Sequence, residues 1–182
     1  MIFLSLMTVI SMLMAPMMTS DTDIPTGRDT AYYYIYTYGT DDMKMDLPME
    51  YLAHEANMTV QEFELFARVV EAESDRTNNL EAKTMIAACI LARVNSDLFP
   101  DSVNSVLTQE GQFTTVSDGW CGIRDTRASR YAINCALDAL RNGDIPTNLL
   151  FFNCIGYNYG TPYGVYGDNY FMTYGEEVEF EL

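Results

Sequence analysis

Apolar residues recur at helical spacing between residues 60 and 74, which predicts an amphipathic helix over this range. Thr59 and Glu62 have the Thr-x-x-Glu spacing of a capping box, in which each side chain bonds the backbone N–H of the other residue. The helix is therefore expected to begin directly after Thr59, and the folded domain near Met58.

A second helix is predicted over residues 80–96, with Asn78 or Asn79 as its N-cap. Its core, MIAACILA, is apolar on every face. A helix that is apolar all round has to be covered on all sides by the rest of the protein. We therefore expect this segment to be the buried central helix of the domain.

Capping and turn signals predict the remaining elements of the domain. They are a short helix capped by Asp101 or Ser102, the long loop EGQFTTVSDGWCGIRD, a helix over residues 128–141 that an Asn-Gly pair stops, and short strands in LLFFN and the Tyr/Gly-rich tail. The expected fold is α+β and mostly helical, with a buried central helix and a C-terminal part of short strands and loops.

The end of the first helix carries two carboxylates on different faces. With Phe66 as reference and about 100° per residue, Glu73 falls within the apolar stripe, whereas Glu71 projects roughly 140° away, towards water. Desolvation and the negative end of the helix dipole would both favour the protonated form of Glu73, as a general acid requires. The alternative is that Glu73 is an ordinary, partly exposed surface residue.

The blocks ARVVEAES, AACILARVNS, LFPDSVNSVLTQEGQF and VSDG follow one another here, and LLFFN and GDNYFM come after them. In this order they resemble the cell-wall hydrolase family of the spore cortex-lytic enzymes, lysozyme-related glycosidases that cut peptidoglycan. The resemblance runs from about Val60 to Met172. It implies a lysozyme-like fold, catalysis by Glu73 without a cofactor, and cleavage of the MurNAc–GlcNAc β-1,4 bond of the glycan strands.

The resemblance also indicates where substrate would bind. Ser74 follows the glutamate as in many lytic transglycosylases, and the EGQF block supplies Gln112, whose amide can both donate and accept hydrogen bonds. Phe113, Phe152 and the ring of Tyr163 could stack on sugars, or could instead anchor their loops in the core. The substrate-binding candidates are Ser74, Gln112, Phe113, Phe152, Asn153 and Tyr163.

A glycosidase usually needs two carboxylates, whereas a lytic transglycosylase needs one. The candidates for a second acid are Glu110, Asp118 and Asp125 in the long loop, where acidic turn residues are also common. A lytic transglycosylase that forms 1,6-anhydro-MurNAc is therefore favoured over a two-acid hydrolase. One departure concerns substrate preference, because SDRTNN replaces the short Arg-Gly-Glu loop that is common in the family and puts Thr77 at its acidic position.

The composition excludes several functions. The 182 residues carry a formal net charge of −16, which opposes binding to nucleic acid and to anionic lipid surfaces. The single histidine, His54, precedes the domain, so a Ser-His-Asp apparatus or a catalytic zinc site is not expected. A monomer that acts on peptidoglycan glycan strands, with no metal, is predicted. The alternative is a non-catalytic glycan-binding or structural module of a cell wall or phage particle.

Residues 1–18 are apolar and uncharged, and are expected to be a signal peptide or a membrane anchor. Residues 19–57 are expected to form an acidic linker whose tract AYYYIYTYG could also add a β-strand to the domain, and residues 58–182 the catalytic domain. A secreted or envelope-associated protein follows, or one that is part of a phage particle or lysis system. Cys89 and Cys135 should be buried thiols, whereas Cys121 and Cys154 could pair after export.

Overall fold

The computed structural model describes residues 27–74, 79–113 and 124–182. The chain divides into two compact units, residues 1–33 and 34–182. Apart from the first part of α2, every described element lies in the second unit.

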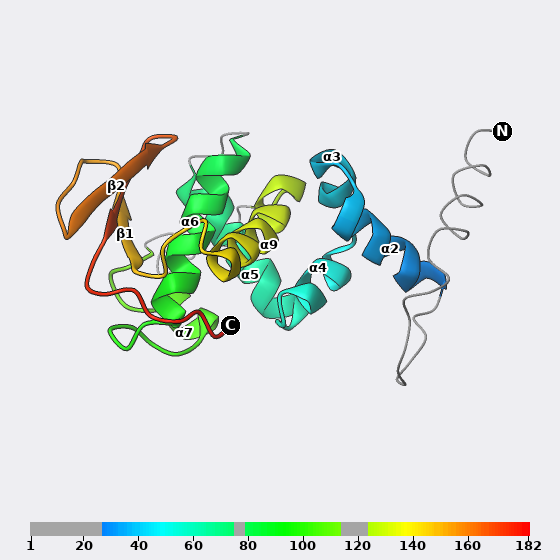
Figure 1. Ribbon diagram of the computed structural model, residues 1–182, viewed down its shortest axis with the longest axis horizontal. Coiled ribbons are helices and arrows are strands. Elements are labelled where there is room, and N and C mark those ends of the chain that lie inside the picture. Colours follow the sequence, from blue (N-terminus) through cyan, green and yellow to red (C-terminus); the bar gives the residue numbers. More distant parts are fainter. Residues whose placement is uncertain (1–26, 75–78, 114–123) are drawn as a thin grey trace. The chain divides into compact units, whose positions relative to one another are not determined.

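The described elements are mostly helical (Figure 1). In chain order they are α2 (Gly27–Tyr38), α3 (Asp41–Met45), α4 (Met49–Glu55), α5 (Val60–Glu73), α6 (Leu80–Val94), α7 (Val103–Leu107), α9 (Arg127–Asn142), β1 (Leu149–Asn153), β2 (Thr161–Tyr166) and β3 (Asn169–Thr173).

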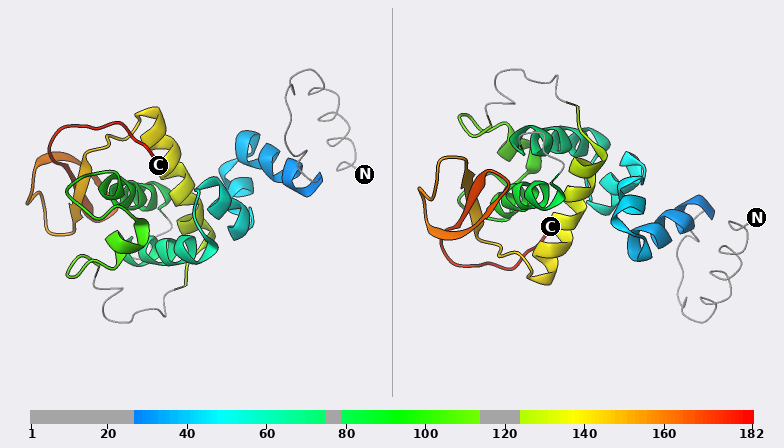
Figure 2. Two further views of the ribbon diagram at one scale, coloured as in Figure 1. Left: turned by 90° about the horizontal axis from the view of Figure 1, so that it is seen from below. Right: turned by 90° about the horizontal axis from the view of Figure 1, so that it is seen from above.

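Helix α6 is the centre of the second unit, as its apolar sequence predicts. Residues Met85 to Val94 are all buried, and Ile86, Ile90 and Leu91 are completely so. Figure 2 shows α6 almost end-on, surrounded by α5, α7, α9 and the sheet. The prediction of a buried central helix is confirmed.

The predicted helix boundaries are confirmed by their caps. Thr59 and Glu62 form the capping box at the start of α5. The side chain of Asn79 accepts a hydrogen bond from the N–H of Ala82, 3.1 Å away, and caps α6. At the end of α9, Gly143 has φ of 75°, a left-handed conformation that glycine adopts without steric cost.

Three short antiparallel strands form a sheet of order β1-β3-β2. Leu149, Leu150, Phe171 and Met172 are the buried residues of this sheet. The sheet packs against α6, with β1 making most of that contact. The prediction of short strands in this part of the chain is confirmed, and the sheet closes one side of the core.

The segment from Gly27 to Ala56 differs from the predicted linker. The tyrosine tract is helical, in α2, so it does not add a strand to the sheet. Two more helices, α3 and α4, follow it. The buried residues here are Leu52 and Ala53 in α4, its C-cap Ala56, and Leu47 in the connection before α4. The spacing of Leu52, Ala53 and Ala56 places them on one side of α4, against α5 and α9. Residues 41–56 are therefore part of the packed structure.

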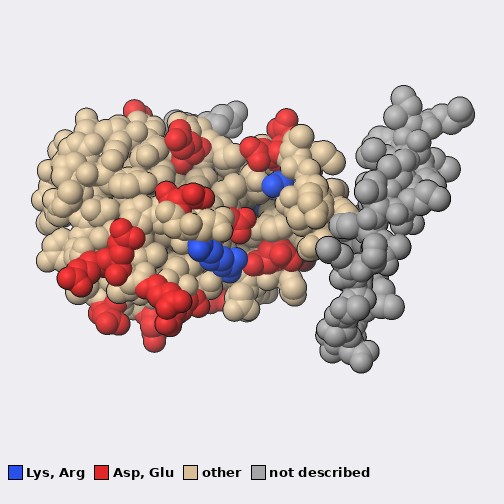
Figure 3. Space-filling model, in the orientation of Figure 1, with Lys and Arg blue, Asp and Glu red and all other residues tan. Residues whose placement is uncertain are grey.

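Acidic side chains are scattered over the face seen in Figure 3, with few basic ones among them. Within the described part of the chain, no helix combines the length and the apolarity needed to cross a membrane. The predicted signal peptide or anchor, residues 1–18, lies outside the described residues.

Candidate active site

The last turn of α5 carries Glu73, the predicted acid. Glu73 is half-buried, and α5 ends there with Ser74 as its C-cap. Carbonyl groups in the last turn of a helix have no partner within the helix. The carbonyl of Glu73 accepts a hydrogen bond from Nδ2 of Asn169, 3.2 Å away, at the start of β3. Glu73 thus lies where α5 meets the hairpin of β2 and β3.

Glu71 was expected to point to water, and this expectation is wrong. Its side chain is buried, and Oε2 accepts hydrogen bonds from Nζ of Lys83 at 2.8 Å and Oγ1 of Thr126 at 2.7 Å. The helical-face argument considered α5 alone. The start of α6 and the start of α9 cover this face of the last turn, and they provide the two donors.

Ser74 is buried and bonded within the protein. Its Oγ donates to the carbonyl of Glu71 at 3.0 Å and accepts a hydrogen bond from Nζ of Lys83 at 2.8 Å. The hydroxyl therefore supports the turn that holds Glu73. A contact between Ser74 and substrate stays a prediction.

The β2–β3 hairpin approaches the start of α6 closely. Gly167, in its turn, has φ of +60°, and a Cβ added there would lie 3.1 Å from Cβ of Ala82. Glycine is needed at this point for both the backbone conformation and the close approach. The hairpin also carries Tyr163, which is 37% exposed. Partial burial raises the pKa of Tyr163, and the neighbouring phenol of Tyr166 adds to this effect.

Gln112 and Phe113 both contact the buried guanidinium of Arg93. Gln112 is exposed, and its Oε1 accepts a hydrogen bond from Arg93 at 3.2 Å. Phe113 is buried, at 3% exposure, and Arg93 lies over its ring, 5.5 Å from the centroid. This burial favours the role of Phe113 as a core anchor of the loop over that of a sugar-stacking ring.

A run of ring contacts connects this loop to the hairpin. Phe113 contacts Phe152, which stacks on Phe171 at a centroid distance of 5.5 Å. Phe171 meets the edge of Tyr166, which in turn stacks on Tyr163. The predicted residues Phe113, Phe152 and Tyr163 thus belong to one aromatic cluster, of which Tyr163 is the exposed end.

Asn153 stabilises its own loop. Its Oδ1 accepts hydrogen bonds from the N–H groups of Ile155 at 2.8 Å and Gly156 at 3.0 Å. This is the local side-chain-to-backbone pattern typical of asparagine in turns. Its role as a substrate ligand stays a prediction. Cys154, next in the chain, is an exposed free thiol, and its proposed partner Cys121 lies outside the described residues.

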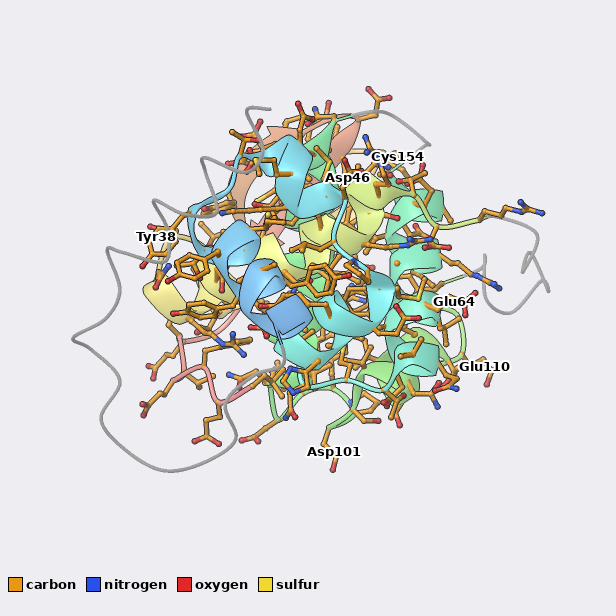
Figure 4. The ribbon with its side chains drawn as sticks, turned by 90° about the vertical axis from the view of Figure 1, so that its right-hand side faces the viewer. Tyr38, Asp46, Glu64, Asp101, Glu110 and Cys154 are labelled. Carbon is orange, nitrogen blue, oxygen red and sulfur yellow. The ribbon has the colours of Figure 1, made fainter. Side chains whose placement is uncertain are left out.

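The candidates for a second acid are placed differently. Glu110, labelled in Figure 4, is exposed. The carboxylate of Asp125 forms an ion pair with Arg130, and Asp118 lies outside the described residues. Among the described residues, no three His, Cys, Asp or Glu side chains are grouped as a metal site.

Lys83, Thr126, Asn169 and Arg93 contact the predicted site residues but were not identified from the sequence. Of these four, Lys83 could have been recognised most readily, because a lysine close to the apolar core of this helix needs a partner if it is buried. Asn169 lies within the GDNYFM block, but the block does not reveal which carbonyl its amide contacts. Such contacts depend on tertiary packing.

Residues 77–166 match the model of the Cell Wall Hydrolase family. Within this range the chain is similar to the cell wall hydrolase family, and we call residues 77–166 the cell wall hydrolase domain. Glu73 precedes the matched range, so its catalytic role stays a prediction. The cell wall hydrolase domain includes α6, α7, α9, β1 and β2 within that range.

Two curated relatives are spore cortex-lytic enzymes. The protein from Oceanobacillus iheyensis is 35% identical over 91 residues, which are 50% of this chain and 32% of that protein. The protein from Bacillus subtilis is 36% identical over 88 residues, 48% of this chain and 28% of that protein. The chain therefore matches about a third of the length of these relatives.

Two solved structures share the fold. The catalytic domain of the germination-specific lytic transglycosylase SleB from Bacillus anthracis has a TM-score of 0.53 at 24% identity and covers 63% of this chain and 96% of its own. The catalytic domain of the Bacillus cereus SleB protein has a TM-score of 0.54 at 25% identity, with 63% and 91% covered. The predicted α+β, mostly helical, lysozyme-like fold is confirmed.

Proposed function

We propose that the cell wall hydrolase domain cleaves the β-1,4 bond between MurNAc and GlcNAc in peptidoglycan. The observation that carries this proposal is the family match over residues 77–166. The spore cortex-lytic enzymes and the lytic transglycosylase domain that resemble the chain support it. The substrate is a glycan strand, and the protein acts as a monomer at the cell envelope or outside the cell.

In this proposal Glu73 acts first as an acid and then as a base. Its carboxyl protonates the glycosidic oxygen while the bond from that oxygen to C1 of MurNAc breaks. The resulting carboxylate then removes the proton from the C6 hydroxyl of the same sugar, and O6 bonds to C1 to close a 1,6-anhydro ring. The proton that Glu73 gives is replaced by the one it takes, so no water is consumed.

The surroundings of Glu73 support a one-carboxylate mechanism. Glu73 is half-buried at the end of a helix, and a hydrogen bond from Asn169 holds its carbonyl. Of the described candidates for a second acid, Glu110 is exposed and Asp125 is paired with Arg130. Attack by a water molecule that a second carboxylate activates is therefore less well supported here than internal attack by the C6 hydroxyl of the sugar.

The products distinguish the mechanisms. Purified full-length protein is incubated with sacculi, and the released muropeptides are identified by mass spectrometry. A transglycosylase yields 1,6-anhydro ends, lighter by one water than the reducing ends that a hydrolase yields. Reducing ends that incorporate labelled oxygen from water would refute the transglycosylase mechanism, but the proposed substrate would stand.

A matched pair of variants tests the role of Glu73. Glu73→Gln should abolish product release, whereas Glu64→Gln on the same helix should leave it unchanged, because Glu64 is partly exposed and pairs with Arg68. Glu73→Gln protein that still releases muropeptides would exclude Glu73 as the acid. Parental protein that binds sacculi but releases nothing would instead favour a non-catalytic glycan-binding module.

A further inference from the structure

A buried ion pair lies beneath the turn that carries Glu73. Nζ of Lys83 is 2.8 Å from Oε2 of Glu71, and the two side chains are only 1% and 7% exposed. Removing two charges from water is costly, and their attraction offsets this cost only when the geometry and the further hydrogen bonds are good. An ion pair this deeply buried cannot contribute to solubility, so another role is expected for it.

The pair is bonded to the turn on both sides of Glu73. Lys83 donates to Glu71 Oε2, two residues before Glu73, and also to Oγ of Ser74, one residue after it. Ser74 Oγ then donates to the carbonyl of Glu71 at 3.0 Å. One ammonium group on α6 thus closes a ring of hydrogen bonds around the backbone that holds Glu73.

A third element completes the network. Thr126 is the N-cap of α9, and its Oγ1 accepts a hydrogen bond from the N–H of Ser129 at 3.1 Å. The same hydroxyl donates to Oε2 of Glu71 at 2.7 Å. Glu71 therefore places a negative charge at the positive end of the α9 dipole, where a carboxylate is stabilised.

We propose that Glu71 and Lys83 are positioning residues, which fix the last turn of α5 so that the carboxyl of Glu73 has one orientation. This inference rests on the proposed function. Helix ends fray readily, whereas a misplacement of about 1 Å at a reacting group can cost about 100-fold in rate. Contacts from α6 and α9 to the side chain of Glu71, and from β3 to the carbonyl of Glu73, immobilise the turn.

The test is the double variant Glu71→Gln/Lys83→Met. It removes both charges together, so no unpaired buried charge remains and the protein should fold. We expect kcat for the release of anhydro ends from soluble glycan strands to fall at least about tenfold, with KM changed less than about twofold. Amide hydrogen exchange in residues 71–74 should become faster.

Two controls separate positioning from stability. Glu64→Gln/Arg68→Met removes a different ion pair of α5, whose side chains are 37% and 36% exposed, and should leave kcat unchanged. Leu52→Ala removes core volume from α4, which carries none of the network. It should lower the melting temperature but leave kcat of the folded protein within about twofold.

The possible failures are distinguishable. If Glu73→Gln abolishes activity while Glu71→Gln/Lys83→Met keeps the parental kcat, the positioning role is wrong and the proposed function stands. If Leu52→Ala loses as much kcat as the double variant at a similar loss of melting temperature, the network is only structural. If the parental protein or Glu73→Gln contradicts the proposed function, the positioning role fails with it.

Discussion

Arg93 is a buried cation whose partners are aromatic rings and carbonyl groups. It is 4% exposed, and its Nε donates to the carbonyl of Leu150 at 2.8 Å. Its guanidinium lies over the rings of Phe99, Phe113 and Phe152, at 5.0, 5.5 and 5.9 Å from their centroids. The flat guanidinium can stack on rings and donate in its plane at once, which an ammonium cannot.

We therefore expect Arg93→Lys to lower the free energy of unfolding by about 2 kcal/mol, although the charge is kept. Lysine would lose the stacking and leave the carbonyl of Leu150 without its donor. Urea denaturation measures the change. Arg127→Lys is the control, because Arg127 is 59% exposed and its pair with Asp46 should contribute less than about 1 kcal/mol. Equal effects of the two substitutions would contradict this reading of Arg93.

At the scale of elements, Gly167 allows the turn of the β2–β3 hairpin to approach α6 closely. Gly167→Ala would impose an unfavourable φ and bring Cβ to 3.1 Å from Ala82. We expect a loss of about 1–2 kcal/mol in the free energy of unfolding and lower activity, because the hairpin also carries Asn169 against the end of α5.

Gly175→Ala provides a matched control. Gly175 has φ of +74°, and an added Cβ there would contact nothing within 4 Å. It should therefore lose about 1 kcal/mol from the backbone alone, with activity retained. The difference between the two variants, measured by urea denaturation and by product release, isolates the contact of the hairpin with α6. Equal losses in both assays would mean that the hairpin does not need this contact.

Elements defined by their own sequence could be predicted, whereas contacts between elements could not. The capping box of Thr59 and Glu62 and the apolar core of α6 depend on neighbours in the chain, and both are found as expected. The burial of Glu71 depends on Lys83 and Thr126, which are 12 and 55 residues away in the chain. A helical wheel contains no information about what covers its polar side.

The short N-terminal helices were missed for a related reason. Tyrosine favours strands slightly, and the tract AYYYIYTYG has no strong helical stripe. In the structure, the hydroxyl of Tyr36 hydrogen-bonds Oδ2 of Asp138 in α9, at 3.4 Å, and its ring meets the edge of Tyr51. Leu52, Ala53 and Ala56 did have helical spacing, but α4 is too short for such a pattern to stand out.

At the scale of the whole molecule, the net charge of −16 opposes close approach to any anionic part of a cell wall. The acidic side chains are scattered in Figure 3, so the repulsion acts over much of that face. Under the proposed function, a domain with this surface would have to hold a glycan by short-range contacts, for which the exposed ring of Tyr163 is a candidate.

The N-terminal helices should be needed for stability. Leu52 is completely buried, and its carbonyl accepts a hydrogen bond from Nδ2 of the buried Asn134 at 3.1 Å. The hydroxyl of Tyr131 donates to Oδ1 of Asp41 at 3.0 Å, and Arg127 pairs with Asp46. Removal of residues 1–57 would take away these partners and expose to water the surfaces of α5 and α9 that α4 covers.

We therefore expect removal of residues 1–57 to lower the melting temperature by several degrees or prevent folding, since losing a buried leucine side chain alone costs about 2–5 kcal/mol. Removal of residues 1–33 leaves the second compact unit whole and should change the melting temperature little. Thermal unfolding of both forms and of the full chain, in the same mild detergent, makes the comparison. If the form that begins at Met58 has the same melting temperature as the full chain, α3 and α4 are dispensable, and the fold begins at the capping box of Thr59.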